Sequence, residues 1–171
     1  MPHRLIPKVM SQIIESLFPD IIARDTADRA HCVQIKELRI GSNPTGSEQD
    51  TGWDLPDNSI IRDCWLYTDT AEATGATKTI DVGILSSEAG GDADGLLDGV
   101  SVSATGNKRG VYTTAATTYG ALLRVDNDGG SHYSPALHIG DNTAKSISFT
   151  SGSAFSEFRG SIFIMYTTLY Q

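Results

Sequence analysis

The sequence predicts an all-β fold, an antiparallel two-sheet β-sandwich of jelly-roll-like type, preceded by a short N-terminal helix or arm. Three observations favour it. Short apolar stretches with a period of two recur from residue 32 to residue 170. Clusters of Gly, Asp, Asn and Ser separate them, and no helical pattern lies between them. Because parallel strands need crossover helices, we expect the sheets to be antiparallel.

The 171 residues suit a single domain, and we expect an N-terminal arm, residues 1–30, followed by a β-sandwich domain, residues 31–171. Apolar residues in the arm recur at spacings of three and four, which lines one face of a helix. They are Ile6, Val9, Met10, Ile13, Ile14, Leu17 and Phe18. A helix of about 11 residues is marginal alone, so this stripe must pack on its own domain or on a neighbouring subunit.

The first strand patterns begin after residue 32. Val33 and Ile35, and then Leu38 and Ile40, alternate with polar residues, and the change of phase between the pairs predicts a β-bulge. Residues 43–52 are expected to form a polar loop. The strongest strand pattern spans residues 59–68. Its predicted core face consists of Ile60, Arg62, Cys64 and Leu66, and its other face of Ile61, Asp63, Trp65 and Tyr67.

The second half of the chain continues the pattern. Residues 77–85 predict a strand with Ile80, Val82 and Ile84 on one side, and residues 88–99 predict a Gly/Asp loop. Further strands are expected at residues 100–104, 110–114, 119–125, 133–139 and 145–150, with a turn at 127–130. The last strand, residues 161–170, is apolar on both faces, so it is central or covered by a partner. The total is eight or nine strands.

Charge narrows the range of partners. The net charge is −8, with 13 basic residues scattered among 21 acidic ones. Proteins that bind duplex nucleic acid neutralise phosphates with clustered Lys and Arg, so nucleic acid is not an expected partner. An anionic membrane is excluded for the same reason, and no apolar run reaches the roughly 18 residues of a membrane span.

No enzymatic chemistry is predicted. The four histidines, His3, His31, His132 and His138, lie in unlike contexts, and the sequence has no G-x-S-x-G elbow or phosphate-binding loop. We therefore expect no catalytic residue and no cofactor. Cys32 and Cys64 are expected to be small buried hydrophobes, although a disulfide bridge between them is conceivable and their redox state stays open.

Two patterns have a functional interpretation beside a structural one. Asp92, Asp94 and Asp98 alternate beside glycines, as calcium ligands do, but the EF-hand spacing is not met, so we predict a solvated loop and no metal ligand. Trp65 and Tyr67 share a strand face, which could bind sugar, yet aromatics at alternate strand positions more often fill a core or an interface.

Three segments, residues 51–63, 70–85 and 91–101, resemble patterns of tailed-phage virion structural proteins of the capsid decoration, or cement, type. The resemblance implies a non-enzymatic β-sandwich protein that binds the outside of the capsid shell and stabilises it. It implies the major capsid protein as partner, self-association as a homotrimer, synthesis in the host cytoplasm and a final location on the virion exterior.

Within this interpretation the arm is our first choice for a partner contact. The residues expected to bind are Ile6, Val9, Ile13, Ile14 and Leu17. A tail, baseplate or neck component is an alternative of the same class. A carbohydrate-binding β-sandwich module is an alternative of another class.

Overall fold

The computed structural model describes residues 33–41, 43–110, 118–127, 130–133, 137–138 and 145–168, with backbone alone for residues 124–138. The expected arm and its helix lie outside these ranges. No helix within the ranges is long and apolar enough to cross a bilayer.

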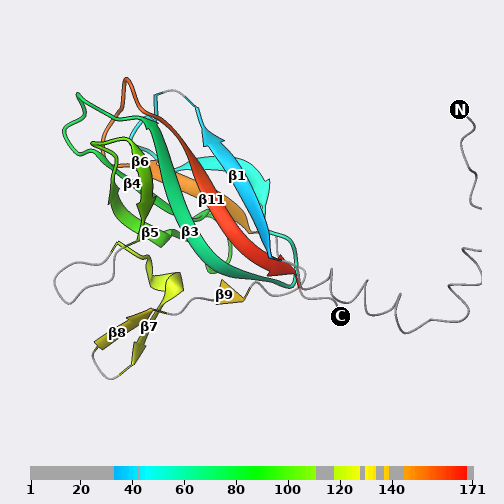
Figure 1. The fold of residues 1–171 in the computed structure, drawn as a ribbon. Helices are drawn as coiled ribbons and strands as arrows, with labels where there is room; N and C mark the ends of the chain where they lie inside the picture. The colour runs from blue at the N-terminus through cyan, green and yellow to red at the C-terminus, as the bar shows by residue number, and fades with distance from the viewer. Residues whose placement is uncertain are drawn as a thin grey trace, which may run out of the picture.

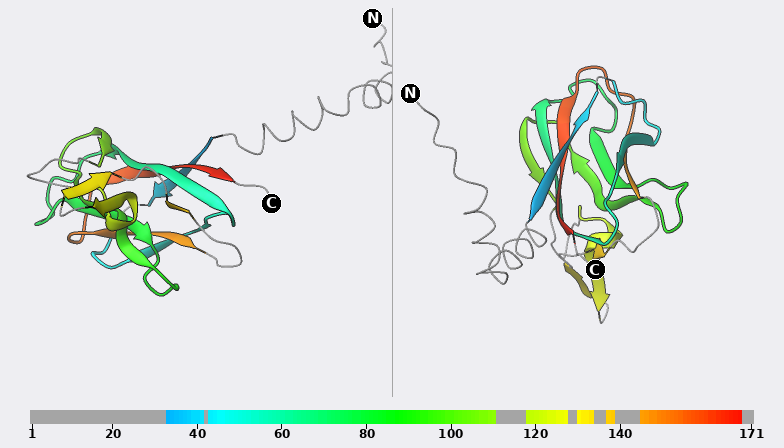
Figure 2. Two further views of the ribbon diagram at one scale, coloured as in Figure 1. Left: turned by 90° about the horizontal axis from the view of Figure 1, so that it is seen from below. Right: turned by 90° about the vertical axis from the view of Figure 1, so that its right-hand side faces the viewer.

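Two antiparallel sheets form the molecule, as the layers in Figures 1 and 2 show. Sheet A has the order β1 (Gln34–Ile40), β11 (Arg159–Thr168), β3 (Ser59–Thr70) and β6 (Gly106–Arg109), and β9 (Leu137–His138) also pairs with β3. Sheet B has the order β2 (Gln49–Asp54), β10 (Ser146–Ser151), β4 (Thr79–Ile84) and β5 (Asp92–Ser101). A turn of 3-10 helix, η1 (Ala121–Leu123), precedes a separate hairpin of β7 (Arg124–Asn127) and β8 (Gly130–Tyr133).

The strand pairings are nested. The innermost pair is β4 with β5, followed outward by β3 with β6, β2 with β10, and β1 with β11. This nesting of one long antiparallel hairpin over two sheets is the arrangement of a jelly roll. The predicted fold class, an all-β two-sheet sandwich, is confirmed.

The core lies between the two sheets and is built from alternate residues of each strand. In β4 the predicted trio of Ile80, Val82 and Ile84 is buried, which confirms the prediction for that strand. Sheet A contributes Ile162 and Ile164 from β11, a strand that lies between β1 and β3 and is therefore central, as expected.

The predicted core face of β3 is wrong in its first half. Ile61, Cys64 and Leu66 are fully buried, whereas Arg62 is exposed and Ile60 only half-buried. The cause is a bulge, because the register with β11 passes from Asp63 opposite Met165 directly to Ile61 opposite Tyr166. One extra residue reverses the alternation between Ile61 and Cys64, and a strict period of two cannot show this.

The bulge predicted in β1 is absent. β1 pairs with β11 in an unbroken register from Gln34 opposite Tyr166 to Ile40 opposite Gly160. Leu38 and Ile40 face the core, while Val33 and Ile35 are each 58% exposed. The phase change in the sequence therefore marks a strand that is apolar on both sides.

Two predicted loops contain strands. Residues 43–52 include the start of β2, and residues 88–99 include most of β5. Both segments carry glycines at positive φ, Gly52 and Gly99, and their pairing shifts register, so their sequences contain turn residues within the strands. The turn predicted at residues 127–130 is confirmed, since Asn127 lies opposite Gly130 at the end of the β7–β8 hairpin.

Candidate functional site

The candidate site is the outer face of sheet A, the side turned away from the core. Figure 1 is drawn with β1, β11 and β3 in front of the strands of sheet B. Alternation brings one large side chain after another to this side. We call it the outer face and define it by Val33, Ile35, Trp65, Tyr67, Arg109, Phe163 and Met165.

The strand register arranges these side chains in rows that cross the strands. One row places Phe163 opposite Trp65, which lies opposite Arg109. A second row places Ile35 opposite Met165, beside the bulge of β3. Side chains opposite one another on neighbouring strands lie in contact distance, so the rows form a continuous surface.

Trp65 is the centre of the outer face. Its ring stacks on that of Phe163, with centroids 5.4 Å apart and planes within 6° of each other. The guanidinium of Arg109 lies 4.7 Å from the centre of the Trp65 ring, a cation–π contact. Since the two neighbours belong to strands on either side of β3, they occupy the ring faces that a stacked sugar would need.

An ion pair fixes the edge of this surface. Asp63 is 6% exposed and accepts a hydrogen bond from its neighbour, the backbone N–H of Cys64, at 2.9 Å. Its other oxygen pairs with Arg109. The Asp63 carboxylate therefore holds the Arg109 guanidinium over the ring of Trp65.

Apolar exposure distinguishes the outer face from an ordinary protein surface. The large hydrophobic side chains that stand out to solvent in the described residues are Val33, Ile35 and Tyr67, at 58%, 58% and 43%. All three belong to this one face. Aromatic residues, Met and Arg are enriched in protein interfaces, so the chemistry of the outer face suits contact with another protein.

The second tryptophan lies elsewhere. Trp53 of β2 packs against Tyr166 of β11 with ring centroids 5.7 Å apart and closes one side of the sandwich between the sheets. The Nζ of Lys36 lies 5.7 Å from the Trp53 ring centre. The two tryptophans thus lie in different places, Trp53 against Tyr166 between the sheets and Trp65 on the outer face.

A buried carboxylate joins two loops at one end of the sandwich. Glu72 is 1% exposed, and one of its oxygens accepts the backbone N–H groups of Thr74 and Gly75 and the Thr74 hydroxyl. The other oxygen accepts three consecutive backbone N–H groups, those of residues 156, 157 and 158, at 3.0 to 3.1 Å. Burial by itself raises the pKa of the carboxyl, but these hydrogen bonds outweigh it and lower the pKa to about 2.

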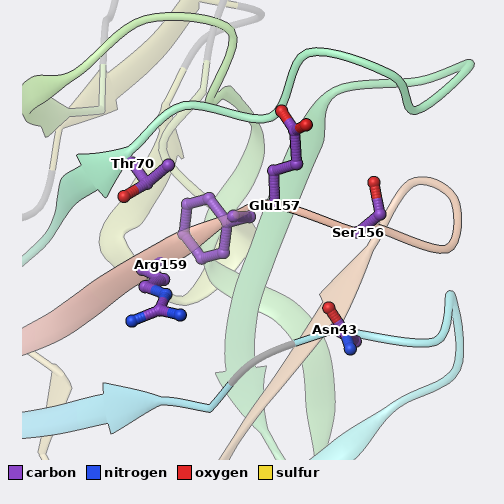
Figure 3. Close-up of a pocket in the computed structure, with 6 residues that line it drawn as sticks. Asn43, Thr70, Ser156, Glu157 and Arg159 are labelled. Atoms are coloured by element: carbon purple, nitrogen blue, oxygen red, sulfur yellow. The ribbon is translucent and has the colours of Figure 1, made fainter.

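A hollow of about 540 Å³ opens beside these loops. Its lining residues are Asn43, Thr70, Ser156, Glu157, Phe158 and Arg159. Figure 3 shows that the side chains of Asn43, Glu157 and Arg159 do not converge on one point. Glu157 and Arg159 are both exposed to solvent, so the hollow lacks the buried polar side chains that orient a ligand in a binding site.

The acidic segment named in the calcium hypothesis is mainly strand. Asp92 and Asp94 share a side-chain hydrogen bond, which together with burial raises the pKa of Asp92. Among the described residues, no group of three or more His, Cys, Asp or Glu side chains is placed to hold a metal ion. The hypothesis therefore has no geometric support in this part of the chain.

The five residues predicted to bind a partner, Ile6, Val9, Ile13, Ile14 and Leu17, lie outside the described residues. So does Cys32, whereas Cys64 is free and buried, and burial raises the pKa of its thiol. Sequence reasoning missed the outer face as a unit. Its signals were the shared face of Trp65 and Tyr67 and the last strand with apolar residues on both sides.

No family model matches the sequence, and no curated protein matches it. Among solved structures, a chain of the cyanophage Pam1 capsid asymmetric unit is similar, with a TM-score of 0.48 and 13% sequence identity. The match covers 81% of this chain and 86% of that chain. A likeness of this degree does not say what this chain binds.

Proposed function

We propose that this protein is a non-enzymatic structural component of a tailed-phage virion that binds the outside of the capsid shell and stabilises it. The observation that carries the proposal is the outer face, where a stacked aromatic pair, an Arg held by an ion pair and exposed aliphatic side chains lie together on sheet A. Trp, Tyr and Arg at such positions dominate the binding energy of protein interfaces. The segments that resemble phage decoration proteins predict that the partner bound by the outer face is the major capsid protein.

Binding explains how such a protein would stabilise a shell. A ligand that binds the assembled state and not the dissociated one shifts the equilibrium toward assembly. If the protein self-associates as a trimer, its contacts act together, and modest single interfaces give tight attachment. The net charge of −8 suits a position outside the shell, away from packaged DNA.

Reconstitution on shells tests the proposal. Empty heads of the same phage, assembled without this protein, are mixed with the purified full chain and separated by sedimentation. We expect the protein to bind at a fixed number of copies per head and to raise the temperature at which heads disassemble. Electron microscopy should place it on the exterior. Binding to tails or baseplates and not to heads would contradict the proposal and support the alternative location.

A pair of matched variants tests whether the outer face matters. Tyr67→Glu puts a charge on the outer face, two residues from Trp65 on β3, and Ser101→Glu puts the same charge at an exposed position of sheet B. Burying an unpaired carboxylate in an interface is costly, so we expect Tyr67→Glu to weaken shell binding at least about tenfold, near 1.4 kcal/mol. Ser101→Glu should bind like the natural chain. Equal binding by the two variants would rule out the outer face.

A further inference from the structure

Residues 93–96 of β5 form a bulge that lies between β4 and the segment around η1. The pairing with β4 passes from Leu97 to Asp92, so these four residues lie opposite the single residue Gly83. An ideal Cβ on Gly83 would lie 1.9 Å from the carbonyl oxygen of Asp92. The backbone of the β5 bulge therefore packs directly on the backbone of β4.

The other side of the β5 bulge contacts η1 and the residue before it. The N–H of Gly120 donates to the carbonyl of Leu96 at 3.0 Å, and an ideal Cβ on Gly120 would lie 2.0 Å from the carbonyl oxygen of Asp94. Gly95 lies against Leu122, whose Cδ1 is 2.4 Å from an ideal Cβ at that glycine. The contacts of the bulge therefore join η1 to sheet B.

Two carboxyl groups lie at the start of the β5 bulge. The side chains of Asp92 and Asp94 share a hydrogen bond. An ionised carboxylate only accepts hydrogen bonds, so two carboxyl groups bond to each other only when at least one of them holds a proton. Without that proton, two negative charges lie side by side and repel each other. The bond across the start of the bulge therefore requires a proton.

Further negative charge surrounds this pair. Asp98, later in β5, acts on Asp92. Asp81 of β4 accepts the N–H of Gly99 at 2.6 Å, which lowers its pKa, but burial and the charges of Asp98 and Asp94 outweigh this bond and raise it. Like charges in one place disfavour the ionised form of each carboxyl, so the surroundings favour a proton on the pair.

The basic side chains of the neighbouring elements do not offset this charge. The Nζ of Lys145, before β10, donates to the carbonyl of Ala89. In β6, Arg109 belongs to the outer face and Lys108 is half-buried on sheet A. The residues of η1 are uncharged. Within the described residues, the charges that act on Asp92 are negative.

We propose that the carboxyl pair of Asp92 and Asp94 holds one proton and acts as a proton-dependent latch on the β5 bulge. Loss of this proton to solvent breaks the bond within the pair, and the bulge and η1 then separate more often from β4. The latch lies in sheet B, so it goes beyond the proposed function, which rests on the outer face of sheet A.

The direction of the pH dependence follows from the pair. The hydrogen bond to Asp94 and then burial raise the pKa of Asp92 above its ordinary value of 3.8. The stability that the latch contributes is therefore fully present below pH 3.8 and is lost as the pH rises through the raised pKa. This is the opposite of a carboxylate whose pKa is lowered by folding.

Hydrogen exchange in the full chain tests the latch. The amide of Gly120 reports separation of the bulge, because it donates to Leu96. We expect its protection, corrected for the intrinsic exchange rate at each pH, to fall at least about threefold between about pH 4 and about pH 8. In Asp94→Asn the amide donates to Asp92 without a proton, so the protection should stay nearly constant over the same range.

Two further variants complete the test. Asp92→Asn replaces the other member of the pair and should also remove the pH dependence. Asp69→Asn is the matched control, since Asp69 is an exposed residue of β3 in sheet A, and it should behave like the natural chain. Protection of Gly120 that does not fall in the natural chain, or that falls equally in both variants of the pair, would overturn the proposal.

Discussion

At the scale of a single residue, Glu72 joins the loop after β3 to the loop before β11. Six donors surround its two oxygens, five of them backbone N–H groups. Buried N–H groups must find acceptors, and a carboxylate offers enough lone pairs to satisfy two loops at once. Phe155 and Phe158 pack beside it with ring centroids 5.8 Å apart, and both belong to the hydrophobic core between the sheets, so Glu72 fixes the loops at one end of that core.

We predict that Glu72 makes the protein acid-sensitive. Its pKa is lowered to about 2 in the folded state, below the ordinary 4.5. The charged carboxylate therefore contributes stability that is fully present above pH 4.5 and is lost as the pH falls toward 2. Glu72→Gln puts an amide NH2 where an oxygen accepts backbone N–H groups. It should lower the free energy of unfolding at pH 7 by roughly 3 kcal/mol, measured by urea denaturation.

The pH dependence distinguishes this account from simple loss of packing. The difference in stability between the natural chain and Glu72→Gln should shrink between pH 4.5 and pH 2, because the natural carboxylate becomes protonated there. Glu157→Gln is the control, since Glu157 is an exposed residue of the same loop and should change stability by less than about 0.5 kcal/mol. A difference in stability between the natural chain and Glu72→Gln that stays constant with pH would contradict the role assigned to the charged carboxylate of Glu72.

At the scale of elements, β4 and β5 approach closely where the register breaks. Val82 lies opposite Leu97, but Ile84 lies opposite Asp92, so β5 carries extra residues that fold over β4. Gly83 lies beneath them. A Cβ on Gly83 would come within 1.9 Å of the carbonyl oxygen of Asp92, which is backbone and cannot rotate away.

Gly83→Ala should therefore separate the two strands. We expect a loss of about 1–3 kcal/mol or more in the free energy of unfolding, because the backbone of β5 must shift. Gly41→Ala is the matched control, since a Cβ there meets nothing within 4 Å, and it should be near neutral. The free energy of unfolding of both variants is measured by urea denaturation. An unchanged stability for Gly83→Ala would show that β5 does not lie where the structure places it.

The same strands show what the sequence could reveal. A regular strand such as β4 was predictable because Ile80, Val82 and Ile84 are buried in an unbroken period of two. β5 was not, because Gly95, which lies against the Leu122 side chain, and Gly99, at positive φ, stand within the strand, and in a sequence such glycines look like a loop. The bulge of β3 was equally hidden, since Ile60 and Ile61 are both apolar and only pairing with β11 decides which faces inward.

The candidate site was only partly predictable, because strand pairing cannot be inferred from local sequence patterns. Trp65 and Tyr67 are separated by one residue, so their shared face was predictable from β3 alone. Phe163 and Arg109 join them only through the register of three strands, and the sequence separation exceeds 40 residues in each case. Contacts of that kind follow from topology, which local patterns do not contain.

At the scale of the whole molecule, the exposed apolar side chains of the outer face indicate that the protein binds another protein through this face. An exposed face with Val33, Ile35 and Tyr67 would be a liability for an isolated protein, and the jelly roll also leaves β1 as an edge strand of sheet A. Contact with another protein that covers these groups removes both problems. The homotrimer expected from the resemblance stays a prediction.

Removal of the arm tests this at the level of the assembly. We expect the full chain to be a stable oligomer, most simply a trimer, by light scattering at micromolar concentration. A chain lacking residues 1–29 should keep the β-sheet circular dichroism signal and cooperative unfolding of the sandwich, because the buried residues of the described strands already form a core between the two sheets. The same chain should become a monomer, and its shell binding should fall in proportion to the lost multivalency. A full chain that is monomeric, or a truncated chain that remains an oligomer with full occupancy on shells, would contradict the role of the arm in self-association and shell binding.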